Sequence, residues 1–302
     1  MKMNRFEFLR TSLGALGLAA LGFPAMAAAI GKKRKLPVSA HVWIYASTQP
    51  GYDVSPILPQ IFSDMKYAGL DGVETMEHPL RKEESTKLIA ELTEQYQLPL
   101  LGTSYGAAMW DQSKHSEILE DVENIMSNMA RVEATTFGTS VGHPSDRIKT
   151  EDELDAQAEL LVKLMALGKK NGVVLNLHNH TYEVENDLFD LKGTLKRVPD
   201  IKLGPDLNWL LRAEVDPISF LKDYHDNINF IHLRDQLSSG LWPESLGEGD
   251  VDFKEIGEVL DSIDFSGDLV IELAHEGDFV PTRPIKESLK MSREYLRKVM
   301  GY

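Results

Sequence analysis

The sequence predicts a single eight-stranded barrel in which strands and helices alternate, the (β/α)8 or TIM barrel fold. From residue 37 to the C-terminus, eight short apolar stretches are each followed by a longer amphipathic stretch. Strands that alternate with helices are typical of a parallel sheet covered by helices. The chain has 302 residues, 42% of them hydrophobic, which is enough to bury one large core. A doubly wound open sheet is the second alternative, but no glycine-rich phosphate turn follows the first strand.

The first half of the barrel is predicted from apolar spacing and from helix boundaries. Ile57, Ile61 and Met65 are four residues apart, as on one face of a helix, and Gly69 closes that helix. Pro99 stands at the first residue of its strand, where a missing N–H is tolerated. The expected strands are 37–45, 72–74, 99–104 and 135–141, and the expected helices are 55–68, 82–95 and 115–132.

The second half begins with a long helix. Thr150 and Glu153 form the pattern of a capping box, so a helix is expected to run from there to about Lys170. The fifth strand begins at Val173. The remaining expected strands are 201–206, 228–235 and 268–274, and the remaining expected helices are 188–197, 217–224, 253–263 and 284–300.

The fifth strand ends in polar residues that a core would not accept. Because side chains alternate along a strand, Asn176, His178 and His180 share one face, while valine and leucine occupy the other. Burying such polar groups costs roughly 2–7 kcal/mol each unless they find partners. A metal ion is one partner that suits two imidazoles. A pair of hydrogen-bonded core histidines is the other interpretation.

Polar residues also follow other predicted strands, at the barrel end where such folds carry their active sites. The strand ends supply Glu74, His143, His178, His180, Asp206, His232, Arg234 and Glu272. A single carboxylate in such a place can face solvent, but four strands ending in His, Asp, His and Glu are harder to explain in that way. Imidazoles and carboxylates together suit Zn²⁺, Mn²⁺, Co²⁺ or Fe²⁺, and the chain has no Cys to supply a thiolate.

Four segments resemble the sugar isomerase/epimerase branch of the xylose isomerase-like TIM barrel superfamily. They are Leu-His-Asn-His-Thr-Tyr-Glu at 177–183, His-Leu-Arg-Asp at 232–235, 246–253 and Val-Ile-Glu-Leu at 270–273, and the resemblance covers about residues 37–300. In that family, a divalent metal is held by an acidic residue on strand five, an aspartate on six, a histidine on seven and a glutamate on eight. The resemblance therefore implies four metal ligands: His178, Asp206, His232 and Glu272.

The resemblance implies an isomerase or epimerase that removes a proton beside a metal-bound carbonyl. The metal polarises the carbonyl and its neighbouring hydroxyl and stabilises an enediolate, and a carboxylate acts as the base. Glu272 is the expected base, and Glu183, His180 and Glu74 are candidates for the second proton-transfer group. His178 stands where the family often has glutamate, so β-elimination from a keto-glycoside is the alternative reaction. A non-catalytic periplasmic sugar-binding protein is the third interpretation.

The expected partner is a small carbohydrate without phosphate. No cluster of Lys or Arg at the strand ends suggests phosphate recognition, and residues 247–250 are expected to form a tight turn rather than a phosphate cradle. Polar and aromatic side chains line ligand pockets. The substrate-binding candidates are Glu74, Tyr105, His143, Trp209 and Arg234. His41 carries no site signal.

The net charge of −15 makes nucleic acid an unexpected partner, because phosphate backbones demand clustered basic residues. This sets aside an endonuclease activity, which relatives of the barrel suggest.

The N-terminus is predicted to be an export signal over residues 1–30, ahead of a barrel domain over 37–302. Lys2, Arg5 and Arg10 precede the uncharged run 11–30, and small residues at 25–27 offer a cleavage point. The segment resembles a twin-arginine signal in which Phe6 replaces the second arginine. We therefore expect a periplasmic protein with no stable membrane insertion after cleavage. An uncleaved membrane anchor is the alternative.

Overall fold

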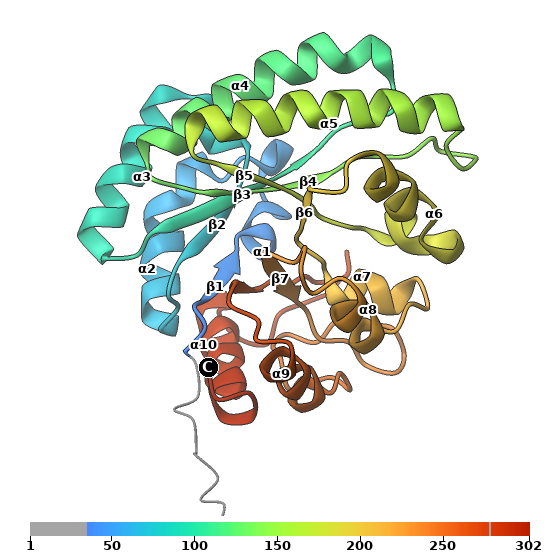
Figure 1. The fold of residues 1–302 in the computed structure, drawn as a ribbon. Helices are drawn as coiled ribbons and strands as arrows, with labels where there is room; N and C mark the ends of the chain where they lie inside the picture. Colours follow the sequence, from blue (N-terminus) through green and yellow to red (C-terminus); the bar gives the residue numbers. More distant parts are fainter. Residues whose placement is uncertain (1–34, 278) are drawn as a thin grey trace, which may run out of the picture. The chain divides into compact units, whose positions relative to one another are not determined.

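The computed structural model describes residues 35–277 and 279–302, and its strands are enclosed by helices (Figure 1). The eight strands are β1 Val38–His41, β2 Val73–Met76, β3 Leu100–Gly106, β4 Thr136–Ser140, β5 Val174–Leu177, β6 Lys202–Leu203, β7 Phe230–Leu233 and β8 Asp268–Ile271. They lie in the order β6-β5-β4-β3-β2-β1-β8-β7, and every neighbouring pair is parallel.

Backbone hydrogen bonds between the segments of β6 and β7 close the sheet into a barrel. The N–H of Asn229 donates to the carbonyl of Leu203 at 2.8 Å, and the N–H of His232 donates to the carbonyl of Pro205 at 2.9 Å. A parallel bridge also joins Asp206 to His232. The predicted (β/α)8 fold is confirmed.

Helices follow the strands in turn and pack around them (Figure 1). The longer helices are α2 Leu58–Ala68, α3 Glu83–Tyr96, α4 His115–Arg131, α5 Glu151–Asn171, α6 Thr181–Arg197, α9 Phe253–Ser262 and α10 Ile285–Val299. The short ones are α1 Trp43–Ala46, η1 Pro50–Tyr52, η2 Ser55–Ile57, η3 His78–Arg81, η4 Gln112–Lys114, α7 Leu207–Arg212 and α8 Pro217–Asp223. Helix α10 packs against α2, so the last helix lies beside the first long one.

Helix boundaries agree with the predicted capping signals. Thr150 accepts from the N–H of Glu153, and the Glu153 carboxylate accepts from the N–H of Thr150, which is the predicted capping box of α5. Gly69 ends α2 in the left-handed conformation, with φ of 74°.

Three expected elements differ from the structure. Residues 43–46 form a helical turn instead of extending the first strand, because the backbone N–H of Ala46 bonds the carbonyl of Val42. Helix α7 at 207–212 was not predicted, and residues 204–206 lie beyond the short strand β6. Helix α6 begins at Thr181 rather than Leu188, with a break at 185–188.

The inside of the barrel below the C-terminal strand ends is filled by Phe230. A Cβ added to Gly204 would lie 2.0 Å from this ring, and one added to Gly138 would lie 3.0 Å from it. Glycine at these two positions therefore makes room for the aromatic ring. The Phe230 ring lies 5.2 Å from that of His232, so an apolar ring lies beneath the site.

Among the described residues, we find no helix whose length and apolar character would allow it to cross a membrane. The predicted export signal at residues 1–30 lies outside the described residues.

Candidate metal centre

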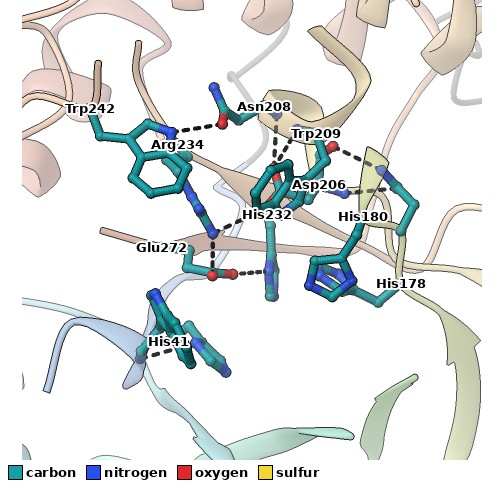
Figure 2. A network of polar contacts seen from close by, with 12 residues as sticks. His41, His178, His180, Asp206, Asn208, Trp209, His232, Arg234, Trp242 and Glu272 are labelled. Atoms are coloured by element: carbon teal, nitrogen blue, oxygen red, sulfur yellow. Dashed lines mark hydrogen bonds and ion pairs between the residues drawn. The ribbon is translucent and has the colours of Figure 1, made fainter. Parts of the chain in front are cut away.

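Four side chains predicted as metal ligands meet in one buried group at the ends of β5 to β8. Each of the four offers one ligand atom, and these atoms all lie within 4.8 Å of one another. Figure 2 shows the imidazoles and carboxylates pointing toward a common centre. The group, called the four-residue centre below, consists of His178, Asp206, His232 and Glu272.

His232 is fixed by a carboxylate behind it. Its Nε2 donates to Oε2 of Glu74 at 2.7 Å, and the Glu74 side chain is buried. Its Nδ1 lies 2.5 Å from Oε2 of Glu272, yet this buried atom has no hydrogen bond of acceptable geometry. Burial lowers the pKa of His232, but the charges of Glu74 and Glu272 outweigh this effect and raise the pKa to about 10. Because Glu74 holds one nitrogen, the other is left to face the centre.

His178 also presents one nitrogen to the centre. Its Nδ1 lies 3.2 Å from the carbonyl of Gly204, which can only accept, so Nδ1 carries the proton and Nε2 keeps its lone pair. Burial lowers the pKa of His178 well below its ordinary value, and the imidazoles of His232 and His180 lower it further. His178 is therefore neutral at physiological pH, which is the form that binds metals.

Asp206 divides its two oxygens between two tasks. Its Oδ1 accepts from the N–H groups of Asn208 at 2.8 Å and Trp209 at 3.3 Å, so it caps the N-terminus of α7. The side chain of Asn179 bonds both the N–H and the carbonyl of Asp206 and thereby fixes this turn. Burial raises the pKa of Asp206, while the guanidinium of Arg234 opposes the rise. Oδ2 is left to face the centre.

Glu272 is the most strongly ionised carboxylate of the centre. The Arg234 guanidinium contacts Oε1 of Glu272 and lies 3.4 Å from Oδ2 of Asp206. Burial raises the pKa of Glu272, but Arg234, His41 and His232 more than offset this and hold it well below its ordinary value. The two imidazoles and two carboxylates form a donor set that fits a divalent ion, and Nδ1 of His232 has no hydrogen bond of acceptable geometry. This donor set does not choose among Zn²⁺, Mn²⁺, Co²⁺ and Fe²⁺.

The other catalytic candidates lie around the centre rather than in it. Glu183 is buried, and its carboxylate accepts from Ser140 Oγ at 2.6 Å and from the N–H groups of Val141 and His180 at 2.9 and 2.6 Å. The His180 ring lies 5.4 Å from that of His178 and 5.5 Å from that of Trp209. Glu183 therefore orients the loop that carries His180.

The structure brings two of the five substrate-binding candidates to the centre. The guanidinium of Arg234 lies over the rings of Trp209 and Trp242, at 5.4 and 4.8 Å from their centroids (Figure 2). These rings form one wall of the centre. The third candidate, Glu74, lies behind His232 instead of facing a ligand.

Tyr105 and His143 lie outside the centre. Ser104 contacts His41 across the barrel end, and side chains alternate along β3, so Tyr105 points away, where its ring lies 5.5 Å from that of Phe137. His143 is exposed on the loop after β4, with its ring 4.1 Å from that of Tyr182.

His41 belongs to the site although the sequence analysis gave it no role. Its Nδ1 accepts from the N–H of Trp43 at 3.1 Å, and its Nε2 therefore donates to Ser104 Oγ at 2.8 Å. Its ring lies 5.5 Å from that of His232. Burial lowers the pKa of His41, while the charges of Glu272 and Glu74 oppose this shift. Its place at the end of the first strand is the signal that would have found it, since the same criterion identified the other site residues.

The glycine-containing segment 247–250 is the predicted tight turn. Oδ2 of Asp235 accepts from the N–H groups of Gly247 at 2.7 Å and Gly249 at 2.9 Å, and Oδ1 accepts from Val251 at 3.2 Å. The backbone amides that would bind a phosphate are thus bonded to a carboxylate of the chain itself.

Replacing Gly249 with alanine is expected to destabilise the protein. The added Cβ would lie 2.3 Å from Oδ1 of Asp235 and 2.7 Å from the carbonyl of Gln236, so the turn must move. We expect a loss of about 1–3 kcal/mol in the free energy of unfolding, measured by urea denaturation. Gly277→Ala is the matched control, because nothing lies within 4 Å of its added Cβ. Equal stability of the two variants would contradict this account of the turn.

The fold and the centre together define a TIM barrel with a candidate metal site at the C-terminal strand ends. Residues 62–298 match the sequence model of the xylose isomerase-like TIM barrel family. The chain therefore belongs to this family, and the predicted resemblance is confirmed.

Relatives of known activity match parts of the chain or its fold. The chain is 28% identical to inosose dehydratase from Clostridium perfringens over 170 residues. This match covers 50% of the present chain and 56% of that enzyme. The chain thus spans about half the length of the curated relatives it matches. Among solved structures, D-psicose 3-epimerase from Clostridium cellulolyticum H10 has a TM-score of 0.71 at 12% identity, covering 88% of this chain and 99% of that one. The 3-keto-D-glucoside 4-epimerase from E. coli has a TM-score of 0.65 at 16% identity, covering 87% and 100%.

Proposed function

We propose that the protein is a divalent-metal-dependent isomerase or epimerase of a non-phosphorylated sugar. The observation that carries this proposal is the convergence of His178, Asp206, His232 and Glu272 in one buried group. Family membership supports it, as do structural neighbours named as sugar epimerases.

The residues of the centre are suited to proton abstraction beside a carbonyl. A divalent ion, when bound, supplies the positive charge that polarises a carbonyl and its neighbouring hydroxyl. Glu272 is the base, because its ionised carboxylate lies in the centre, within reach of a substrate held there. The guanidinium of Arg234 lies beside it and stabilises negative charge that develops on the substrate.

A second group must return the proton if the configuration of a carbon is to change. His180 is our candidate, because its ring lies 5.4 Å from that of His178 and 5.5 Å from that of Trp209, at the edge of the centre. Burial lowers the pKa of His180, but the hydrogen bond and the charge of Glu183 raise it above its ordinary value overall. Histidine with such a pKa exchanges protons near neutral pH.

Two observations favour a substrate without phosphate. In TIM barrels, phosphate frequently binds at the loops after strands seven and eight. Here the amides of the loop after β7 donate to Asp235 instead. Export, which we propose from residues 1–30, agrees with this, and N-terminal sequencing of the mature protein tests that part of the proposal.

β-Elimination from a keto-glycoside is the second candidate reaction. The centre has a histidine at the end of β5, so the only carboxylates in it are Asp206 and Glu272. An enzyme with one carboxylate base can remove a proton and expel a leaving group from the neighbouring carbon. The partial match to an inosose dehydratase also favours this candidate.

Incubation with oxidised and unoxidised glucosides in D₂O, followed by NMR, separates these reactions. Deuterium at one carbon of an intact sugar is the expected result, because proton abstraction and return exchange that hydrogen with solvent. A released aglycone together with an unsaturated sugar would establish elimination instead. Tight sugar binding without exchange, in a protein that contains no metal, would show a non-catalytic sugar-binding protein.

A further inference from the structure

A cavity of about 370 Å³, lined by none of the four residues of the centre, takes no part in the chemistry described above. One wall is the loop that follows β4, with His143, Arg147 and Lys149. The other wall is the start of α6, with Tyr182 and Asn186. Because both walls follow C-terminal strand ends, the cavity is on the same side of the barrel as the centre.

Aromatic rings connect the cavity to the centre. The Tyr182 ring lies 4.1 Å from that of His143 and is stacked on that of His180 at 5.4 Å, with an angle of 17° between the planes. His180 in turn lies 5.4 Å from His178. The Tyr182 hydroxyl bonds Ser140 Oγ at 2.8 Å and lies 3.2 Å from Nδ1 of His180. Tyr182 and His180 therefore form a continuous row of rings that runs from the cavity to His178, the first residue of the centre.

The two walls are held together by a buried ion pair. The Nζ atom of Lys149 contacts Asp190 of α6 and bonds Oε1 of Gln157 at 2.6 Å. Gln157 also donates to Oδ1 of Asp190 at 2.9 Å. The Lys149 side chain is only 2% exposed, so the loop is anchored to two helices. The cavity is thus a preformed feature of the fold.

The α6 wall contains an unusual backbone. Asn186, Asp187 and Leu188 have φ values of 53°, 58° and 59°, so three successive residues with side chains are left-handed. Such residues occur mainly one at a time because the conformation is unfavourable. Strain of this kind clusters at ligand-binding positions. Here it interrupts α6 at the point where Asn186 borders the cavity.

We propose that this cavity binds the second sugar ring of a disaccharide whose first ring lies at the four-residue centre. This inference rests on the proposed function. The cavity volume falls in the range of roughly 300–1,000 Å³ found for ligand pockets. The exposed ring of His143 offers a face to the C–H groups of a pyranose, while the Asn186 side-chain amide offers a donor and an acceptor for its hydroxyls. The proposed substrate class is therefore a glycoside with at least two sugar units.

Calorimetric titration of the purified, Mn²⁺-loaded protein tests this inference. The matched probes are cellobiose against methyl β-D-glucopyranoside, and maltose against methyl α-D-glucopyranoside. For at least one linkage we expect the disaccharide to bind about tenfold tighter, which corresponds to about 1.4 kcal/mol. Neither His143→Ala nor Asn186→Gly buries a new group, and glycine accepts the φ of 53° at position 186. Each variant should reduce this affinity ratio toward one.

The control variant is Asn124→Ala, which changes a separate cavity between η3 and α4 and should leave the ratio unchanged. A ratio of one for both linkages in the wild-type protein would overturn the inference, as would an unchanged ratio in both cavity variants. A gain for 4-nitrophenyl β-D-glucopyranoside without a gain for either disaccharide would also overturn it, because the cavity would then select an aromatic group. Failure of the proposed function is distinguishable, since it would appear as missing metal or missing deuterium exchange.

Discussion

His232→Ala is expected to remove the bound metal and the activity together. The substitution deletes one of the four proposed ligands and leaves Glu74 and Glu272 without the imidazole that lies between them. The loss of metal affinity should exceed the roughly 10–100-fold that is typical when only an outer hydrogen-bond partner is removed. Elemental analysis should find about one ion per wild-type chain, as expected for one centre, and almost none in the variant.

Glu74→Gln is the matched comparison for this prediction. Glutamine keeps the size of Glu74 and can still accept from Nε2 of His232, but it lacks the charge that makes the imidazole a stronger ligand. We therefore expect metal affinity to fall by about 10–100-fold while the ion is regained at high concentration. Equal metal content in the wild-type protein and in His232→Ala would remove the metal centre from the proposal.

The barrel and the four-residue centre were predictable because both depend on features local to each strand. Alternation of short apolar and long amphipathic segments indicates the fold, and the polar residue that ends a strand identifies a candidate ligand. The centre then follows from the fold alone, since parallel strands bring their C-terminal ends together. His178 and Glu272 are 94 positions apart in sequence and still meet.

The supporting contacts were not predictable, because they depend on which face of a strand meets which partner. Glu74 and His232 are 158 residues apart in sequence. Only the closed barrel shows that the side chains of these two residues, on β2 and β7, meet inside it. Tyr105 was expected in the site but lies outside it. The register between β2 and β3 shifts at Val73 and Glu74, so the sequence does not indicate which β3 side chains point into the barrel. Trp43–Ala46 is apolar and buried apart from the half-buried Trp43, and such a short run does not distinguish a strand from a helical turn.

Asp206 shows how one residue can give two signals. It was predicted as a ligand because it ends a strand, but aspartate is also among the preferred residues at a helix N-terminus. In the structure Asp206 caps α7 with Oδ1, while Oδ2 faces the centre and accepts from Arg234 at 3.4 Å, so its role as a ligand stays a prediction. Helix α7 brings Trp209 to the edge of the centre, so the cap also builds the aromatic wall.

Glu272→Gln is expected to stop proton transfer even when the metal site is filled. The amide oxygen of glutamine can still serve as a ligand, but it cannot accept a proton from a carbon acid. Loss of a general base costs roughly 10²–10⁴-fold in rate. The rate of deuterium incorporation in D₂O should therefore fall by at least about 100-fold. The measurement is made at saturating metal, because the substitution also weakens the contact with Arg234 and the affinity of the centre.

Glu276→Gln makes the same chemical change four residues later, where the side chain is 37% exposed and lies 3.6 Å from Arg212. Its exchange rate should stay close to that of the wild-type protein, because an exposed ion pair contributes little. If Glu272→Gln with a full metal site exchanged deuterium at the wild-type rate, Glu272 would be a ligand only. The base would then have to be His180, whose pKa Glu183 raises and whose ring already lies at the edge of the centre.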